Sequence, residues 1–548
     1  MKLDLANITD YIFRQPVLNF EKTMNNDQFK EIDGLINSGN FYEANIKNEI
    51  LLQSAIEEKD EAKKAIFLFN IAGFFVDIGH LLKENSISQK GLDLLEENRN
   101  IILQVVPKSE YFYDLANAKS NLTANISGEN INFDNIEELI EVKNLYWKAF
   151  KENQTENDIN LKLRVNLANS LKQQFRISEA LRYYDEVLND DNEIFQANVN
   201  RSHALKILNA ISDTYSAKLF KEIIYGYSEA CRSPNIPPQF VEHYELRKTE
   251  TIKILKSFGF SDERKLDDEE TDAEFQILSE YRKFCIMRKL TLSEHALYCN
   301  CIGAARDNLT IPLTNKQIGG DFVPKMEAIL NRVKSEFSLA RLSYYEYINC
   351  STDTTDLDFE NCYTDLMNGE VLGVSIEKLR TSFRICFGIL DKIALAICEL
   401  YIIETEGDIY FQNFWKLDFK NNRKKFDSIK NPGLLALYSI ATDLNVHKKG
   451  EWACFKDWRN ALEHGMLFIY KDRESFRDPY NSLEFLNSPV PVMVELNDFL
   501  DFIVELLQLT RSAIFSFVFC VRDYANEKNK TGMVTTLNRV NYDRNIIL

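Results

Sequence analysis

Residues that interrupt helices are scarce in this chain. Its 548 residues include only 19 Gly and 11 Pro, so few tight turns break it and long helices are favoured over many short strands. Hydrophobic residues make up 45% of the chain and aromatic residues 12%, which is enough apolar surface for sizeable buried cores. Because one core rarely serves so long a chain, we predict an all-α protein of roughly two to four domains.

The charge of the chain limits the classes of partner that it can bind. A net charge of −18 argues against a general nucleic-acid-coating protein, because phosphate binding requires clustered cations. The charge is uneven, however, and residues 411–480 carry about +4. The basic residues of this region that precede the motif described below are Lys416, Lys420, Arg423, Lys424, Lys425, Lys430, Lys448 and Lys449. They are compatible with binding a short stretch of RNA, and a solvated lysine-rich loop is an equally good interpretation.

The amino-terminal half follows a pattern of successive amphipathic helices with short polar breaks. Its clearest unit runs from Leu161 to Ile194, where the small residues Ala168 and Ala180 allow two antiparallel helices to approach closely. This spacing resembles a tetratricopeptide repeat of 34 residues, although Asn192 stands where that family often has proline. We predict a tetratricopeptide-like helical solenoid over residues 1–265, with a plain helical bundle as the alternative.

The sequence pattern changes in the carboxy-terminal half. The acidic run Asp267–Asp272 is typical of a linker or exposed turn, and residues 273–313 are interpreted as mostly helical, so we predict a helical connector over 266–320. Longer and more apolar helices follow, and they are expected at about 323–350, 374–405, 432–445, 451–465 and 495–526, with a short extended run at 466–470. We interpret residues 321–528 as a bundle of four or five helices and 529–548 as a polar tail.

Several classes of site are not expected. The ten cysteines are scattered, mostly in apolar helical settings. We interpret them as reduced thiols of a cytoplasmic protein. The closest pair, Cys299 and Cys301, has neither a second pair nor a nearby histidine cluster, so we expect no metal. Apolar stretches such as 385–403 and 513–521 are interrupted by charges or too short, so we expect no membrane span and no signal segment. No glycine-rich phosphate loop or nucleophile motif is found, so we expect no cofactor.

One short motif carries distinctive chemistry: Arg459-Asn460-Ala461-Leu462-Glu463-His464, followed by Gly465. A guanidinium can stabilise the extra negative charge of a phosphorane, and an imidazole can move a proton near neutral pH. On an ideal helix Arg459 and His464 are about 140° apart, whereas Asn460 and His464 share one face. We expect Gly465 to end the helix, and Glu463 to pair with Arg459 or to remain in solvent.

A single copy of this motif is half of a site. Two copies related by a two-fold axis would bring two arginines and two histidines around one cleft, which predicts a homodimer with a composite active site. RNA supplies its own nucleophile, the 2′-hydroxyl group. His464 would deprotonate it, Arg459 would neutralise the phosphorane, and Asn460 would orient the imidazole or contact phosphate. Because a histidine at a helix end often only caps carbonyl groups, the spacing alone leaves a structural role open.

The surroundings of the motif resemble the HEPN superfamily (higher eukaryotes and prokaryotes nucleotide-binding domain), whose ribonuclease signature is an arginine, a polar residue, a few further positions and a histidine. The resemblance covers roughly residues 321–526 and includes the strings at 375–380, 390–394 and 433–440. It implies a bacterial, metal-independent endoribonuclease that acts as a toxin or anti-phage effector and leaves 2′,3′-cyclic phosphate and 5′-hydroxyl ends. The matching catalytic pair is Arg459 and His464.

The sequence thus predicts a solenoid that binds a protein or peptide and regulates a dimeric HEPN nuclease acting on RNA. The alternative is a non-catalytic scaffold whose HEPN-like bundle serves for protein interaction, dimerisation or nucleotide binding. Within the bundle, Asp391-Lys392 is interpreted first as a structural ion pair and second as a supporting partner of the active site. The nuclease hypothesis requires the imidazole of His464 to lie outside the apolar interior.

Overall fold

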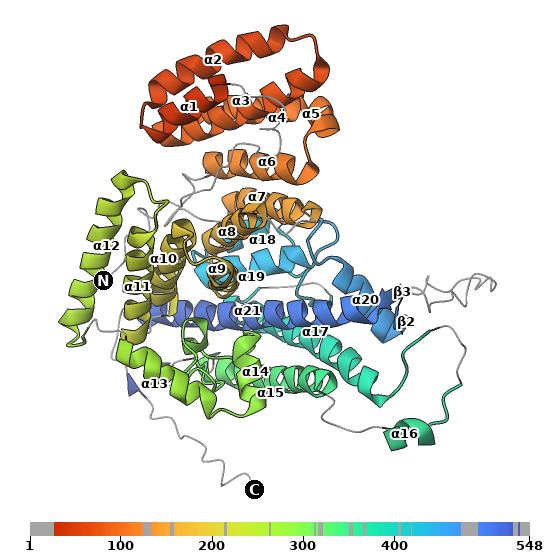
Figure 1. The fold of residues 1–548 in the computed structure, drawn as a ribbon. Helices are drawn as coiled ribbons and strands as arrows, with labels where there is room; N and C mark the ends of the chain where they lie inside the picture. Colours follow the sequence, from red (N-terminus) through yellow and green to blue (C-terminus); the bar gives the residue numbers. More distant parts are fainter. Residues whose placement is uncertain are drawn as a thin grey trace. The chain divides into compact units, whose positions relative to one another are not determined.

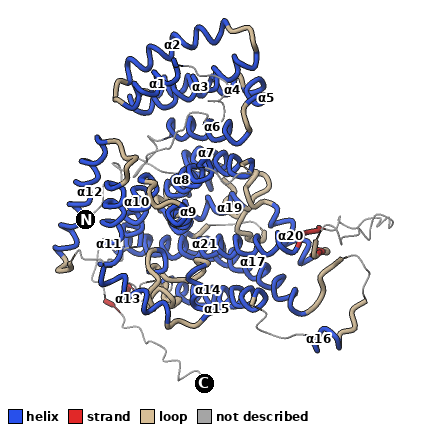
Figure 2. Tube along the Cα trace, viewed as in Figure 1, coloured by secondary structure: helices blue, strands red, loops and turns tan. Residues whose placement is uncertain are grey.

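The chain folds into two compact units, Met1–Glu263 and Arg264–Leu548. Both are built almost wholly from helices (Figure 2), so the predicted all-α class is confirmed. The computed structural model describes residues 27–529 and 535–536 except for these segments: 124–132, 154–157, 213–215, 262–264, 312–313, 316–321, 350–354, 365–368, 404–406, 418 and 473–491.

Unit 1 is a series of helices in which each helix contacts the next one along the chain (Figure 1). The helices are α1 (Asp27–Asn37), α2 (Phe41–Glu57), α3 (Glu61–Leu82), α4 (Asn85–Glu97), α5 (Arg99–Val105), α6 (Lys108–Thr123), α7 (Phe133–Glu152), α8 (Asp158–Gln173), α9 (Ile177–Asp190), α10 (Phe195–Ser212), α11 (Ala217–Arg232) and α12 (Pro238–Ser257). Packing between sequence neighbours is characteristic of helical solenoids, so the unit is consistent with irregular repeats.

The helix pair predicted between Leu161 and Ile194 is formed by α8 and α9, which contact each other. Ala168 and Ala180 are fully buried, as expected where two helices approach closely. Phe175 in the turn between them has the left-handed conformation, with φ of 60°. A left-handed residue of this kind lets the chain reverse direction directly after a helix.

Unit 2 is centred on four helices, α15 (Phe322–Ile348), α17 (Val374–Tyr401), α19 (Pro432–Asp443) and α21 (Leu496–Asn529). In this group α15 packs on α17, and α21 contacts all three others. The predicted bundle helices begin within about three residues of the observed ones. The remaining helices of the unit are α13 (Lys265–Gln276), α14 (Glu280–Met287), α16 (Thr355–Glu360), α18 (Lys420–Asp427), α20 (Cys454–His464) and the short 3-10 turn His295–Leu297.

Two short strand pairs complete unit 2. Strands β2 (Leu467–Tyr470) and β3 (Val492–Glu495) pair in parallel, with Leu467 opposite Val492. The extended run predicted after the motif is therefore confirmed. Strands β1 (Thr314–Asn315) and β4 (Thr535–Thr536) pair antiparallel. Most of the predicted polar tail lies outside the described residues.

Close contact between α19 and α21 depends on one glycine. A Cβ atom at Gly433 would lie 2.5 Å from the backbone nitrogen of Cys520, so no larger residue fits there without a shift of backbone. Asn431 caps the same helix end, because its Oδ1 accepts the N–H of Leu434 at 2.9 Å. Its Nδ2 also donates to the carbonyl of Cys520 at 3.0 Å. Small size and capping together fix α19 on α21.

Two predictions for the segment before the bundle are wrong. The acidic run Asp267–Asp272 lies within α13, where carboxylates near a helix amino terminus are favoured by the helix dipole. Residues 273–313 are not mostly helical, because the described part after α14 has only the turn His295–Leu297 as helix. This irregular segment is held instead by Asp307, which pairs with Arg341 of α15 at 2.7 Å. The predicted connector, 266–320, belongs to unit 2.

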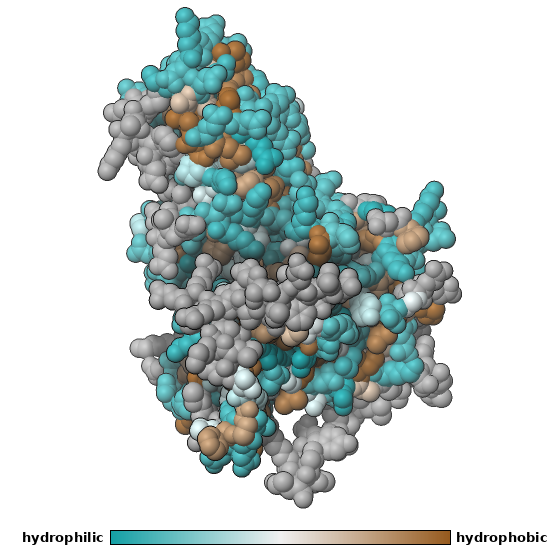
Figure 3. Space-filling view, turned by 90° about the vertical axis from the view of Figure 1, so that its right-hand side faces the viewer, coloured by the Kyte–Doolittle hydropathy of each residue, from teal (hydrophilic) through white to brown (hydrophobic). Residues whose placement is uncertain are grey.

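Two helices, α3 and α21, are long and apolar enough to cross a membrane by length and composition alone. Most of each apolar window is buried inside the fold, 67% in α3 and 83% in α21, as in the core helices of soluble proteins. On the face drawn in Figure 3, hydrophobic residues form separate patches among hydrophilic ones. The structure therefore gives no clear membrane-spanning segment among the residues that it describes.

Candidate active site

Aromatic packing fixes α20, the helix that carries the polar motif. The ring of Phe455 lies 5.6 Å from Phe383 of α17, and the ring of Trp458 lies 5.9 Å from Phe499 of α21. Phe383 and Phe499 also stack on each other at 5.9 Å. Phe455 and Trp458 are three residues apart and so share one helix face. The motif residues beyond them thus stand on a firmly packed helix.

Arg459 is held at the surface of α17. Its Nη2 lies 3.7 Å from Oδ2 of Asp391, and its guanidinium lies 5.5 Å from the ring centre of Tyr410. The other carboxylate oxygen of Asp391 accepts the N–H of Phe411 at 2.9 Å. Burial raises the pKa of Asp391, while the Phe411 hydrogen bond and the charges of Arg459 and Lys392 oppose that rise. Arg459 remains 26% exposed, so its guanidinium is oriented and still accessible to an anion.

Asp391 therefore contacts the motif, as the second of the two sequence interpretations requires. It does not form a closed pair with its neighbour Lys392, whose Nζ instead lies 3.0 Å from Oε2 of Glu336 on α15. Asp391 supports Arg459, which lies 68 positions further along the chain. A carboxylate that holds a guanidinium restricts its rotamers before substrate arrives.

His464 and Asn460 are both exposed. Helix α20 ends at His464, and Gly465 caps it with its N–H donating to the carbonyl of Ala461 at 3.1 Å. The predicted helix end is therefore confirmed. Gly465 is extended there, with φ of −136°, and not left-handed. Within the described part of the chain, neither side chain has a hydrogen-bond partner, so both are available to a ligand.

Two arginines of α17 hold the backbone on either side of His464. Nη2 of Arg384 donates to the carbonyl of Leu462 at 2.9 Å, and Nη2 of Arg380 donates to the carbonyl of Leu467 at 3.2 Å. Residues four apart on a helix lie on one face, so one face of α17 hydrogen-bonds the backbone before and after His464. We call Arg380 and Arg384 the arginine bracket.

The partner of Glu463 differs from the prediction. Its carboxylate lies 3.8 Å from Nε of Arg384, whereas Arg459 pairs with Asp391. The expected pairing of Glu463 with Arg459 is therefore wrong. Helix α20 packs against α17, and that helix supplies an opposite charge to each of the two residues. Glu463 thus pairs with a residue of another helix and not with one of its own helix.

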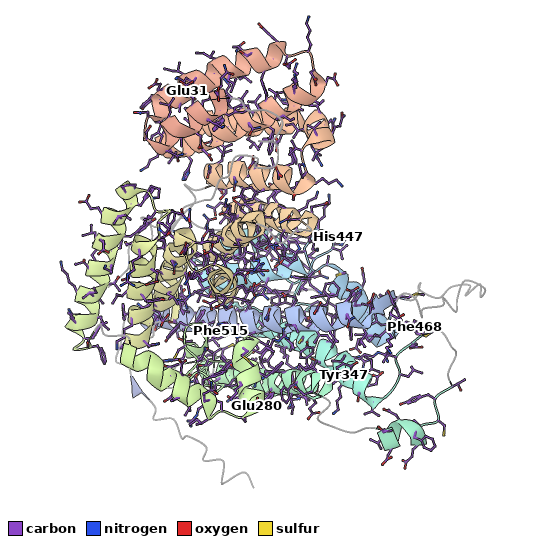
Figure 4. The ribbon with its side chains drawn as sticks, viewed as in Figure 1. Glu31, Glu280, Tyr347, His447, Phe468 and Phe515 are labelled. Atoms are coloured by element: carbon purple, nitrogen blue, oxygen red, sulfur yellow. The ribbon has the colours of Figure 1, made fainter. Side chains whose placement is uncertain are left out.

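Exposed cations occur in the chain segments that precede α20. In the described residues around α18 and the turn before α20, the exposed basic side chains are Lys420, Lys424, Lys430, Lys448 and Lys449. The turn is joined to the Tyr410 segment, because Nδ2 of Asn445 donates to the carbonyl of Gln412 at 3.2 Å. Figure 4 labels His447 in this turn and Phe468 in β2, the two chain segments on either side of α20. These lysines can add sequence-independent attraction for a phosphate backbone.

Sequence reasoning did not identify Tyr410, Arg380 or Arg384. The arginine bracket had a detectable signal, because Arg380 and Arg384 are four apart and so share one face of the helix predicted at 374–405. Tyr410 had none, since it lies in an irregular segment whose path depends on packing. Among the residues with described positions, no group of three or more metal-ligating side chains is placed to hold an ion.

Comparison with known proteins bears on the carboxy-terminal unit. Residues 319–524 match a family model described as LA2681-like HEPN, and this range includes the motif and the arginine bracket. A comparison with curated proteins and one with solved structures gave no match.

Proposed function

Since residues 319–524 form a HEPN domain, we propose that the protein is a metal-independent endoribonuclease with Arg459, Asn460 and His464 as its catalytic residues. The observation that carries this proposal is the state of His464. Its imidazole is exposed at a helix end whose backbone is held on both sides, and Asn460 is exposed one turn before it. A histidine that only capped the helix end would instead hydrogen-bond its last carbonyl groups.

The proposed reaction uses groups of the chain and of the RNA alone. The imidazole of His464 removes the proton from the 2′-hydroxyl, whose oxygen attacks the adjacent phosphorus. Arg459, already oriented by Asp391, neutralises the charge that develops on the phosphorane oxygens. Asn460 orients the imidazole or binds a phosphate oxygen. The bond to the 5′-oxygen then breaks, leaving a 2′,3′-cyclic phosphate and, once that oxygen is protonated, a 5′-hydroxyl.

The reaction needs a base and an acid, and each chain supplies one copy of His464. We propose a homodimer through the HEPN bundle, in which a two-fold axis brings two copies of the motif around one scissile phosphodiester. The second imidazole or a water molecule then protonates the leaving oxygen. The exposed lysines near α18 extend the attraction to flanking phosphates.

We propose that the protein acts as a toxin or anti-phage defence effector, as the HEPN resemblance implies. We propose that unit 1, as a tetratricopeptide-like solenoid, binds a protein or peptide that controls the nuclease. Helical solenoids offer extended surfaces suited to such ligands.

The test is RNA cleavage by the purified full chain in EDTA, beside the variants Arg459→Ala and His464→Ala. We expect cleavage by the unchanged protein, with ends that resist phosphatase until acid opens the cyclic phosphate. Both variants should lose activity by about 10²-fold or more. His447→Ala is the matched control, because His447 is also exposed and lies in the turn before α20. A loss of activity in this control would contradict the assigned role of His464.

Mixing the two inactive variants tests the composite site. A mixed dimer brings the intact arginine of one chain to the intact histidine of the other, so part of the activity should return. No return would contradict a shared site. If no protein cleaves, toxicity on overexpression that His464→Ala relieves identifies a nuclease awaiting its trigger. Absence of both cleavage and toxicity favours the non-catalytic scaffold.

A further inference from the structure

Basic side chains gather between three consecutive helices of unit 1, far along the chain from the motif. They are His203 and Lys206 of α10 and His243 and Arg247 of α12, and the charge of Lys172 of α8 also acts on His203. We call these five residues, with Tyr227 of α11, the α10–α12 basic cluster. The ring of Tyr227 lies 5.9 Å from that of His203, and Nζ of Lys206 lies 4.7 Å above it.

Two polar atoms in the cluster are buried without a partner. Nδ1 of His203 and the hydroxyl of Tyr227 have no hydrogen bond, although the two residues are only 6% and 0% exposed. Buried polar groups in folded proteins are nearly always hydrogen-bonded, because an unmet donor or acceptor costs its full desolvation. Because the two rings lie 5.9 Å apart, one ligand can supply partners to both atoms.

Two cations of the cluster, Lys206 and Arg247, share one carboxylate. Glu250 is the carboxylate that acts on Lys206, and it already lies 3.4 Å from Nη1 of Arg247. Burial and the charge of Arg247 lower the pKa of Lys206 to about 8. Burial and the charges of Lys172 and Lys206 hold the pKa of His203 well below its usual range. Cations that depress one another in this way are stabilised by an anion placed among them.

The cluster can be reached by a ligand. His243 is exposed, and Lys206 and Arg247 are only partly buried, so one side opens to solvent. The ring of Tyr244 stacks on Tyr227 at 6.1 Å and forms an apolar wall beside the cations. The available donors are an ammonium, a guanidinium, an imidazole and a phenol, the set that binds a multiply charged oxyanion through charge-assisted hydrogen bonds.

We propose that the α10–α12 basic cluster binds a small, multiply charged oxyanion, either a phosphate group or a polycarboxylate. Lys206 and Arg247 neutralise its charge, and Tyr227 and His203 donate hydrogen bonds to its oxygens. This site is separate from the nuclease motif and does not depend on whether that motif cleaves RNA.

Isothermal titration calorimetry on the full chain, in a buffer free of phosphate and sulfate, tests the site. The probes are inorganic phosphate, adenosine 5′-monophosphate and citrate, which distinguish a bare phosphate, a nucleotide and a polycarboxylate. We expect at least one to bind, and Lys206→Gln and Arg247→Gln each to weaken it by about tenfold or more. Lys253→Gln is the matched control, because Lys253 is an exposed lysine of the same helix α12.

Each outcome of the titrations either supports or overturns the proposed site. Binding that Lys206→Gln weakens and Lys253→Gln leaves unchanged supports the site, and the strongest probe identifies the ligand class. No heat with any probe at millimolar concentration overturns the proposal, as does equal weakening by both lysine variants. Because Lys206 is only partly buried, its variant should fold, and a thermal unfolding curve confirms this before titration.

Discussion

Replacing Arg384 by glutamine should loosen the segment that presents His464. The variant loses the charge-assisted hydrogen bond to the carbonyl of Leu462, a contact of 2.9 Å. Such a bond contributes about 2 kcal/mol. The ion pair with Glu463 adds little, because both side chains are more than a third exposed. We therefore expect the free energy of unfolding to fall by about 2 kcal/mol, chiefly from the lost bond.

The effect on cleavage should be larger on turnover than on binding. Arg384 touches the backbone beside His464, so its loss misplaces the imidazole without removing a group of the reaction. A misplacement of about 1 Å can cost roughly 10²-fold in rate. The measurements are urea denaturation and steady-state RNA cleavage, with KM and kcat determined separately. Arg384→Lys, which can still donate to the carbonyl, should recover part of kcat.

Two outcomes would refute this reasoning. One is a kcat equal to that of the unchanged protein, and the other is a rise in KM alone. Arg332→Gln is the control, because Arg332 is an arginine of α15 with a side chain 72% exposed and a surface ion pair to Glu336. It should alter neither stability nor cleavage appreciably.

Two further predictions concern ionisation. Burial raises the pKa of Asp391, so its carboxyl group binds a proton more tightly in the native state than in the unfolded chain. The free energy of unfolding should therefore fall as pH rises from about 4 through the raised pKa of Asp391. Urea denaturation between pH 4 and 7 should show this fall in the unchanged protein and not in Asp391→Asn; parallel profiles would contradict it. For Asp307, the buried guanidinium of Arg341 holds the pKa well below its usual range, so its contribution is complete above about pH 4 and is lost as pH falls further. Asp307→Asn should destabilise the protein by about 3 kcal/mol at pH 7, and an unchanged midpoint of denaturation would refute this.

Much of the local structure was predictable because it depends on near neighbours along the chain. Apolar spacing placed the bundle helices, and Gly465 marked the end of α20 at His464. The shared helix face of Asn460 and His464 also followed from a spacing of four. The prediction of a linker at the acidic run 267–272 was wrong, because carboxylates suit the first turns of a helix as well as they suit a linker.

The residues that surround the motif could not be predicted in the same way. Arg384, Asp391 and Tyr410 lie 70, 63 and 44 positions before Cys454, the first residue of α20. Their contacts depend on how α17 and α20 cross and on the path of an irregular segment. A local pattern predicts which face of a helix is apolar, but not which residue of another helix that face meets.

The amino-acid sequence by itself determined the helical class, the positions of the bundle helices and the chemistry available at Arg459, Asn460 and His464. Only the tertiary structure decided that Asp391 orients the guanidinium, that the arginine bracket holds the imidazole segment, and that unit 1 places Lys206 over the ring of Tyr227. The physical reason is range. Helix formation is governed by residues within a few positions of one another, whereas charges and hydrogen bonds between helices exist only once packing has set their register.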